Sequence, residues 1–358
     1  MIKTAYKLSG TGRKAMLILF SVLTLTGCNI WEDLPECPPT TGKVWISFTF
    51  NYHDTKDEGG NYPNLFAETV HRTDLFIFNE DNLLVKTISD LQGPFTNTYK
   101  IPVELPTGNY HAVAWNNLYD SNATQLSSEA LPGSTVEKNM KVQLSELGTK
   151  EITLHPAPLL YGHTTLFSIA SVNSRANNDE IIPISLMRDT HKVNFTIKWK
   201  NKTTRKLCPL WEHANSTLIT IEDNNGICDF DNVQQSCDVF TYIPRYLTGE
   251  HSPNKDETLS EDGAAALRAQ FSTMRLFLDS SPIIHIYKVQ TDGSRVEVYQ
   301  GNLMVDILSK RYNKQEDLDR PESFDIELVF DCESNQPWAV IDLMVDGWRL
   351  VDNGDMEI

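Results

Sequence analysis

Short segments that alternate apolar and polar residues, separated by turn residues, set the strongest limit on how this chain can fold. The first, residues 44–50, is rich in β-branched and aromatic side chains, as half-buried strands are. Comparable strands are predicted at 73–78, 83–88, 108–115, 181–187, 191–199, 271–278, 283–289, 324–330 and 339–345. One segment predicts a helix, residues 260–269, with Ser260 as N-cap and four alanines. This pattern indicates an all-β protein built from β-sandwiches.

The N-terminal residues have the form of an export signal. Four basic residues and no acidic residue precede a short apolar run, residues 16–25, which is about half the length that crosses a membrane. The run ends in Leu25-Thr26-Gly27-Cys28, which resembles the bacterial lipobox. In that motif the signal is removed and the new N-terminal cysteine carries the lipid. We therefore expect lipidation at Cys28; the alternatives are a plain secretory signal and an uncleaved anchor.

The length of 358 residues allows about two domains. We divide the chain into a signal at 1–27, an acidic, proline-rich tether at 28–42, one sandwich at 43–176 and another at 177–358. Without the signal, the charge becomes 27 − 48 = −21, because the signal contains four of the 31 basic residues and none of the 48 acidic ones. A chain this acidic repels phosphate backbones, so we expect no nucleic-acid partner.

Two local features allow alternative interpretations. The loop Asp223-Asn224-Asn225-Gly226 offers oxygen ligands of the kind calcium prefers, but its glycine is not where an EF-hand loop has one. Asn-Gly between two apparent strands, 216–222 and 227–230, instead favours a hairpin turn. Once Cys28 is lipidated five cysteines remain, and Cys228 and Cys237 would form a disulfide if the ends of the loop between them meet.

No catalytic motif is recognisable. The sequence has no G-x-S-x-G elbow, no paired-histidine metal motif, no P-loop and no dinucleotide fingerprint. We therefore expect a protein without enzymatic activity, cofactor or metal. Tryptophans such as Trp45, Trp115, Trp199 and Trp348 can stack on sugar rings, but their place in strand patterns favours packing in the core.

Several patterns together resemble the anchor lipoproteins of Bacteroidales-type (type V) fimbriae. They are the lipobox with its acidic follower 32–38, the opening strand 44–52, and the segments 73–79, 160–162, 187–193 and 341–348. They follow in the family's order over nearly the whole chain. The resemblance implies two tandem transthyretin-like (Greek-key) sandwiches, a lipid anchor in the outer membrane with exposure at the cell surface, and a role in fimbrial assembly and length control.

The same resemblance implies contacts with fimbrial stalk subunits of the donor-strand type, in which a sheet accepts a strand from another subunit. Fibre-forming members expose a basic cleavage site, and Arg72 and Lys86 lie near early strands. Cutting after Arg72 would separate the sandwiches from the lipid, so we predict that it is not cut. The alternative function is that of a surface glycan-binding lipoprotein of a carbohydrate-uptake system, which needs exposed aromatic residues clustered on one face.

Overall fold

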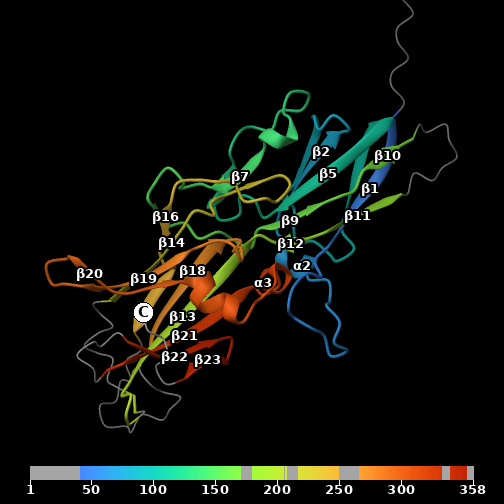
Figure 1. Cartoon of the computed structure of the whole chain (residues 1–358). Helices are drawn as coiled ribbons and strands as arrows, with labels where there is room; N and C mark the ends of the chain where they lie inside the picture. Colours follow the sequence, from blue (N-terminus) through green and yellow to red (C-terminus); the bar gives the residue numbers. More distant parts are fainter. Residues whose placement is uncertain are drawn as a thin grey trace, which may run out of the picture.

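The computed structural model describes residues 41–170, 180–204, 206–207, 217–249, 266–332 and 339–352, and in them the fold is all-β, as predicted. Two sandwiches lie end to end, the N-terminal one at the upper right of Figure 1 and the C-terminal one at the lower left. The short helices are α2 (Phe66–Thr69), η2 (Glu137–Asn139), η4 (Leu303–Ile307), η5 (Leu308–Lys310) and α3 (Gln315–Asp319).

The N-terminal sandwich consists of two sheets. Sheet 1 has the order β11-β1-β4, with β11 (Ile181–Ser185), β1 (Thr41–Thr49) and β4 (Lys100–Pro106). Sheet 2 has the order β12-β9-β5-β2-β3, and β10 also pairs with β5. Its strands are β2 (Thr73–Asn79), β3 (Leu84–Asp90), β5 (Gly108–Asn116), β9 (Leu160–His163), β10 (Phe167–Ile169) and β12 (Met187–Arg188).

The C-terminal sandwich also has two large sheets. Sheet 3 runs β17-β18-β13-β21-β22-β23: β13 (Thr190–Lys200), β17 (Tyr246–Gly249), β18 (Leu267–Met274), β21 (Ser323–Asp331), β22 (Val340–Val345) and β23 (Trp348–Asp352). Sheet 4 runs β20-β19-β14-β16-β8: β8 (Glu151–Ile152), β14 (Thr217–Asp223), β16 (Phe240–Tyr242), β19 (Ile283–Val289) and β20 (Arg295–Asn302). The small sheet 5 joins β6 (Thr124–Leu126), β7 (Lys141–Leu144) and β15 (Ile227–Asp229).

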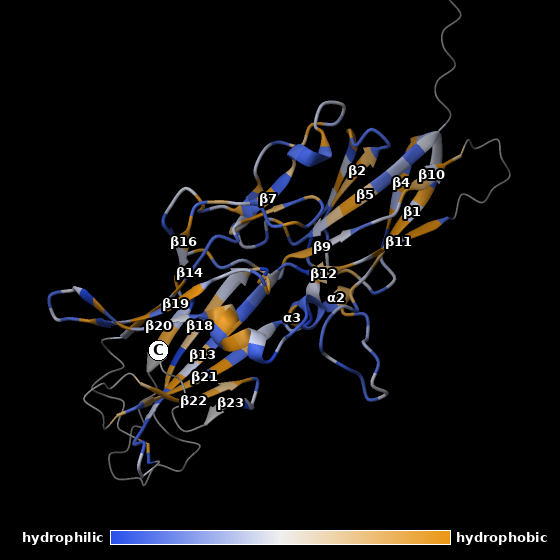
Figure 2. Ribbon diagram, in the orientation of Figure 1, coloured by the Kyte–Doolittle hydropathy of each residue, from blue (hydrophilic) through white to orange (hydrophobic). Residues whose placement is uncertain are grey.

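Sheet 2 is buried on both faces, which explains the unbroken apolar run of β2. Leu75 and Ile77 face the core shared with sheet 1. Phe76 and Phe78 point the other way and pack on Phe230, in a second core that continues into the C-terminal sandwich. Burial on both faces requires successive apolar residues, as in β2, whereas the strands of the chain as a whole mix hydrophobic and hydrophilic residues (Figure 2). The two sandwiches therefore share buried surface.

Strand pairing crosses the division that we placed at residues 176 and 177. β11 and β12 follow it in sequence, yet β11 pairs in parallel with β1 and β12 pairs with β9. β8 precedes it, yet pairs with β16 of sheet 4. Close approach at this crossing depends on Gly162, because a Cβ there would lie 2.5 Å from Ile184 Cγ2. The partner of each strand depends on contacts far apart in sequence, which local patterns do not reveal.

Two sequence predictions are wrong. The segments on either side of Asp223–Gly226 do not form a hairpin, since β14 pairs with β16 and β19 while β15 pairs with β7. The predicted helix at 260–269 overlaps strand β18, which begins at Leu267; residues 260–265 lie outside the described part. Ala266 and Ala269 are buried, so packing against the core overrides the helical preference of alanine here.

Candidate functional site

The chain enters the folded part through the middle strand of sheet 1. Cys28 and residues 29–40 lie outside the described part, and β1 begins at Thr41, inside the range expected for the tether. On one side β1 pairs with β4 in antiparallel fashion, from Thr41 to Ser47; on the other it pairs in parallel with β11, from Trp45 to Thr49. In the described residues no helix is long and apolar enough to span a membrane. If the protein is attached through Cys28, force on the tether would act on β1, which is hydrogen-bonded to a neighbouring strand on each side.

The two outer strands of sheet 1 carry prolines. Pro102 and Pro106 lie on β4, and Pro183 lies on β11. Proline has no N–H group, so it is tolerated on edge strands where that group would face away from the neighbouring strand. A further strand added to either edge would lack a donor at each of these positions. Sheet 1 is therefore poorly suited to accept another strand.

Arg72, the basic residue beside a possible cleavage point, is held firmly. Its guanidinium donates two hydrogen bonds to the buried Asp74, at 2.5 and 2.8 Å. Its backbone N–H donates to Asn117 Oδ1 at 3.2 Å, and its carbonyl accepts from Asn117 N–H at 2.9 Å. A protease needs an extended, accessible backbone, and these bonds remove Arg72 from that state.

Trypsin treatment of the folded protein is expected to cut after Lys56 well before Arg72. Lys56 lies in an exposed loop of the same sandwich and provides a matched basic residue. Mass spectrometry of the first fragments gives the order of the cuts. A first cut after Arg72 would contradict the protection inferred from Asp74 and Asn117.

At one of the crossings between the sandwiches, two strands are separated by a single residue, Asp189. It lies between β12 of sheet 2 and β13 of sheet 3, and it is fully buried. Its N–H donates to the Leu159 carbonyl at 2.8 Å, and Thr190 Oγ1 accepts from Leu159 N–H at 3.0 Å. Asn232 donates to Asp189 Oδ1 at 3.0 Å. The connection leaves little freedom between the sandwiches.

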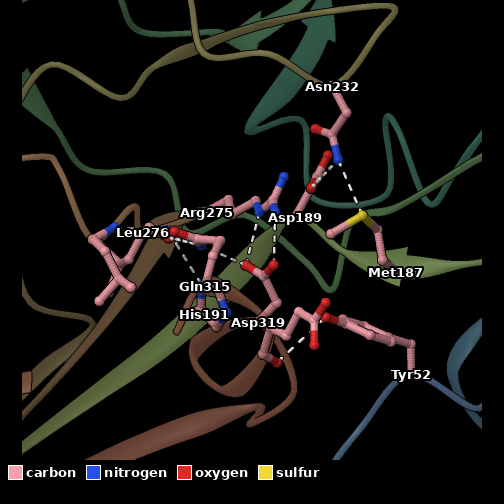
Figure 3. A network of polar contacts seen from close by, with 11 residues as sticks. Tyr52, Met187, Asp189, His191, Asn232, Arg275, Leu276, Gln315 and Asp319 are labelled. Carbon is pink, nitrogen blue, oxygen red and sulfur yellow. Dashed lines mark hydrogen bonds and ion pairs between the residues drawn. The ribbon is translucent and has the colours of Figure 1, made fainter. Parts of the chain in front are cut away.

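A buried ion pair lies beside this link (Figure 3). Arg275, which follows β18, donates from Nε and Nη2 to Asp319 of α3, at 2.8 and 2.6 Å. Gln315 Nε2 donates to the same carboxylate at 2.8 Å, and to the Leu276 carbonyl at 2.9 Å. Side-chain exposure is 11% for Arg275 and 3% for Asp319. The pair fixes α3 against the end of β18.

Burial changes the acidity of two groups in this network. It raises the pKa of Asp189 to about 7, and the nearby Asp319 adds to this while Arg275 and the Asn232 hydrogen bond oppose it. Burial lowers the pKa of His191 to about 3, helped by Arg188 and Arg275. Near pH 6 the folded chain therefore holds a protonated Asp189 and a neutral His191.

The loop before α2 packs against the region around α3 where the two sandwiches meet. Tyr52 donates from its hydroxyl to the Glu316 carbonyl at 3.3 Å, and the Arg320 guanidinium lies 4.4 Å from the Tyr52 ring centroid. A cavity of about 410 Å³ opens here. Its lining includes Tyr161, Met187 and Asp319. Tyr161 and His163 lie side by side in the lining: Tyr161 Oη lies 3.1 Å from His163 Nδ1 and donates to the Phe230 carbonyl at 3.0 Å.

Protein contacts hold part of the loop that offered calcium ligands, although Asp223 Oδ2 is buried without a hydrogen-bond partner. Asp223 Oδ1 accepts from Asn224 N–H at 2.8 Å, and Asn225 donates to the Met274 and Arg275 carbonyls. Burial raises the pKa of Asp223 to about 6, against the hydrogen bond from Asn224. Within the described ranges no three His, Cys, Asp or Glu side chains are grouped to hold a metal.

The sequence allowed a disulfide between Cys228 and Cys237. Cys228 and Cys237 are both free thiols; Cys228 is buried in β15, and Cys237 Sγ donates to the Asn224 carbonyl at 2.9 Å. The disulfide between them is therefore not formed in the structure, whereas Cys332 is disulfide-bonded.

The tryptophans divide between core and surface. Trp115 and Trp199 are in the core, as predicted, but Trp45 is only half-buried, because its neighbours Val44 and Ile46 take the inward-facing positions of β1. Trp348 was predicted to lie in the core with Val345, but it is 61% exposed because it follows the turn at Asp346 and Gly347 at the free edge of sheet 3. The Arg311 guanidinium lies 4.7 Å from its ring centroid.

Solved structures share this fold. The fimbrial anchor protein Mfa2 from Porphyromonas gingivalis is 20% identical, with a TM-score of 0.65 over 87% of this chain and 99% of that one. Two proteins of Bacteroides thetaiotaomicron VPI-5482 match equally well. One, a proposed adhesin, is 20% identical, with a TM-score of 0.67 over 89% of this chain and all of that one. The other, proposed to bind polysaccharide, is 21% identical, with a TM-score of 0.66 over 88% and 100%.

No curated protein sequence matches the chain. A family model does match, that of the fimbrillin-A associated anchor proteins Mfa1 and Mfa2, over residues 34–354. This confirms the resemblance found in the sequence, and with it the expected kind of fold. The chain belongs to the family of fimbrillin-A associated anchor proteins.

Proposed function

We propose that this protein anchors a fimbria to the outer membrane through a lipid on Cys28, and that it takes part in fimbrial assembly and length control. Family membership associates the protein with the cell surface and with fimbrial subunits, in a structural rather than an enzymatic role. The observation that carries the finer proposal is the lipobox, which leads within a short tether into the middle strand of sheet 1.

The proline-bearing edges of sheet 1 support a role at the end of the fibre. Stalk subunits joined by donor strands need an edge that accepts a strand, and sheet 1 lacks N–H donors at Pro102, Pro106 and Pro183. Donor-strand contacts with a stalk subunit then involve the edges of sheets other than sheet 1, and the fibre ends at the sandwich next to the membrane.

Replacing Cys28 with alanine tests the proposal. The variant is expected to fold normally and to leave the membrane fraction for the medium, because nothing else in the proposal holds it there. Fractionation with immunoblotting measures the loss, and electron microscopy shows whether fibres are released with it. Replacement of Cys37 with alanine is the control and should leave the protein in the membrane fraction. Retention of the Cys28 variant in that fraction after a high-salt wash would refute lipid anchoring.

A further inference from the structure

The outer face of sheet 1 carries an apolar row with lysines around it. Trp45 of β1 lies between Pro102 of β4 and Ile181 of β11 in the strand register. Ile181 is 51% exposed, and Pro102 is exposed as well. The ammonium groups of Lys43 and Lys100 lie 4.6 and 4.5 Å from the Trp45 ring centroid. Tryptophan with neighbouring lysines is the combination found where proteins meet lipid headgroups.

The charges on this face differ from those of the whole chain, whose net charge is −17. Besides Lys43 and Lys100, Lys86 of β3 contacts the edge strand β4 beside this face, where its Nζ donates to the Glu104 carbonyl at 3.2 Å. Among the described residues of sheet 1 and those next to its strands, the acidic groups are Glu104 and Glu180. In this part of a strongly acidic protein lysines thus outnumber carboxylates, which favours an anionic partner over a cationic one.

We propose that the outer face of sheet 1 rests on a phosphate-bearing lipid surface, namely the membrane that holds the protein. This inference rests on the proposed lipid at Cys28. Residues 28–40 reach about 45 Å at most, at about 3.5 Å per residue, and they end at Thr41, the first residue of β1. The lipid therefore keeps this face close to the headgroups, and a weak surface contact gains from the high local concentration.

The contact would also orient the molecule. Sheet 2 lies between sheet 1 and the core that continues into the C-terminal sandwich, so the outer face of sheet 1 points away from that sandwich (Figure 1). With sheet 1 on the membrane, sheets 3 and 4 face outward. The C-terminal sandwich is then the part available to the first stalk subunit.

Vesicle binding by the full chain with Cys28 replaced by alanine tests the face without its lipid. We expect this protein to sediment with vesicles of phosphatidylglycerol and phosphatidylethanolamine at low salt, and not with vesicles of phosphatidylcholine alone. Since each lysine near an anionic surface contributes about 5-fold in affinity, Lys43→Gln with Lys100→Gln should weaken binding by about 30-fold. Trp45→Thr should also weaken it.

The matched control variants change residues at sheets 3 and 4, away from sheet 1. Lys150→Gln with Lys288→Gln removes two exposed lysines elsewhere, and Trp348→Thr removes an exposed tryptophan that also has a cation over its ring. These controls should bind as well as the parent. Equal binding to both vesicle types, or equal loss in controls and test variants, would overturn the proposal. The proposal would also be overturned if the parent protein does not bind vesicles and the sheet 1 variants instead lose binding to a purified stalk subunit.

A cell experiment separates this inference from the proposed function. With Cys28 intact, the Lys43 and Lys100 variant should stay in the membrane fraction, because the lipid alone holds it. If Cys28→Ala stays in that fraction even after a high-salt wash, which removes a charge-based surface contact, lipid anchoring fails. If vesicle binding does not depend on Lys43 and Lys100, only the surface contact fails.

Discussion

Replacing Asp319 with alanine is expected to lower the free energy of unfolding by about 3–5 kcal/mol, because it leaves the charge of Arg275 buried without its partner. Gln315 loses its hydrogen bond to the same carboxylate, so α3 is loosened as well. Chemical denaturation followed by tryptophan fluorescence measures the change.

Two further variants make this result specific. Replacing both Arg275 with methionine and Asp319 with leucine should cost much less than Asp319→Ala alone, since no unpaired charge remains. The exposed pair Lys192 and Glu322, at 2.5 Å, is the control, and Lys192→Ala should cost no more than about 1 kcal/mol. If Asp319→Ala is no more costly than Lys192→Ala, the buried pair does not stabilise this junction.

Asp189 and His191 are expected to have opposite effects on how stability depends on pH. The folded-state pKa of Asp189 is raised from 3.8 to about 7, so its contribution is greatest in acid and is lost as pH rises through about 7. The folded-state pKa of His191 is lowered from 6.5 to about 3, so its contribution is lost as pH falls below 6.5. Between about pH 4 and 6.5, folding moves one proton from the histidine to the aspartate, and the two effects cancel.

Single replacements expose each effect. In Asp189→Asn the histidine acts alone, and the free energy of unfolding should rise with pH by about 1.4 kcal/mol per unit relative to the wild type. In His191→Gln the aspartate acts alone, and it should fall by the same amount. Urea denaturation at pH 4.5, 5.5 and 6.5 gives the slopes. Parallel curves for the three proteins would contradict this account.

The sequence was informative wherever strands pair with their neighbours in the chain. The hairpin β2–β3 and the alternation of β1 and β21 follow the predicted segments, because turn residues and burial on one face are local signals. The placement of β11 beside β1 has no such signal, since the pairing joins segments more than a hundred residues apart.

Local sequence patterns also did not predict the buried contacts where the two sandwiches meet. Arg275, Asp319 and Asp189 come from separate segments and form no motif, so only the folded chain shows that they meet. The sequence contained one indication of the buried ion pair. Arg275 interrupts the apolar run 274–278, and a charged residue inside such a run needs a partner when it is buried. For Cys28 the sequence remains the whole basis of the proposal.

The position of β1 matters for a protein that carries load. In a lipid-anchored molecule, tension in the tether enters the fold at Thr41 and acts along β1. Since β4 and β11 hold that strand on both sides, the pull shears two ladders at once instead of peeling one strand from an edge. Shear loads many backbone hydrogen bonds together, so a fibre tugged by flow would meet its greatest mechanical resistance at the strand nearest the membrane.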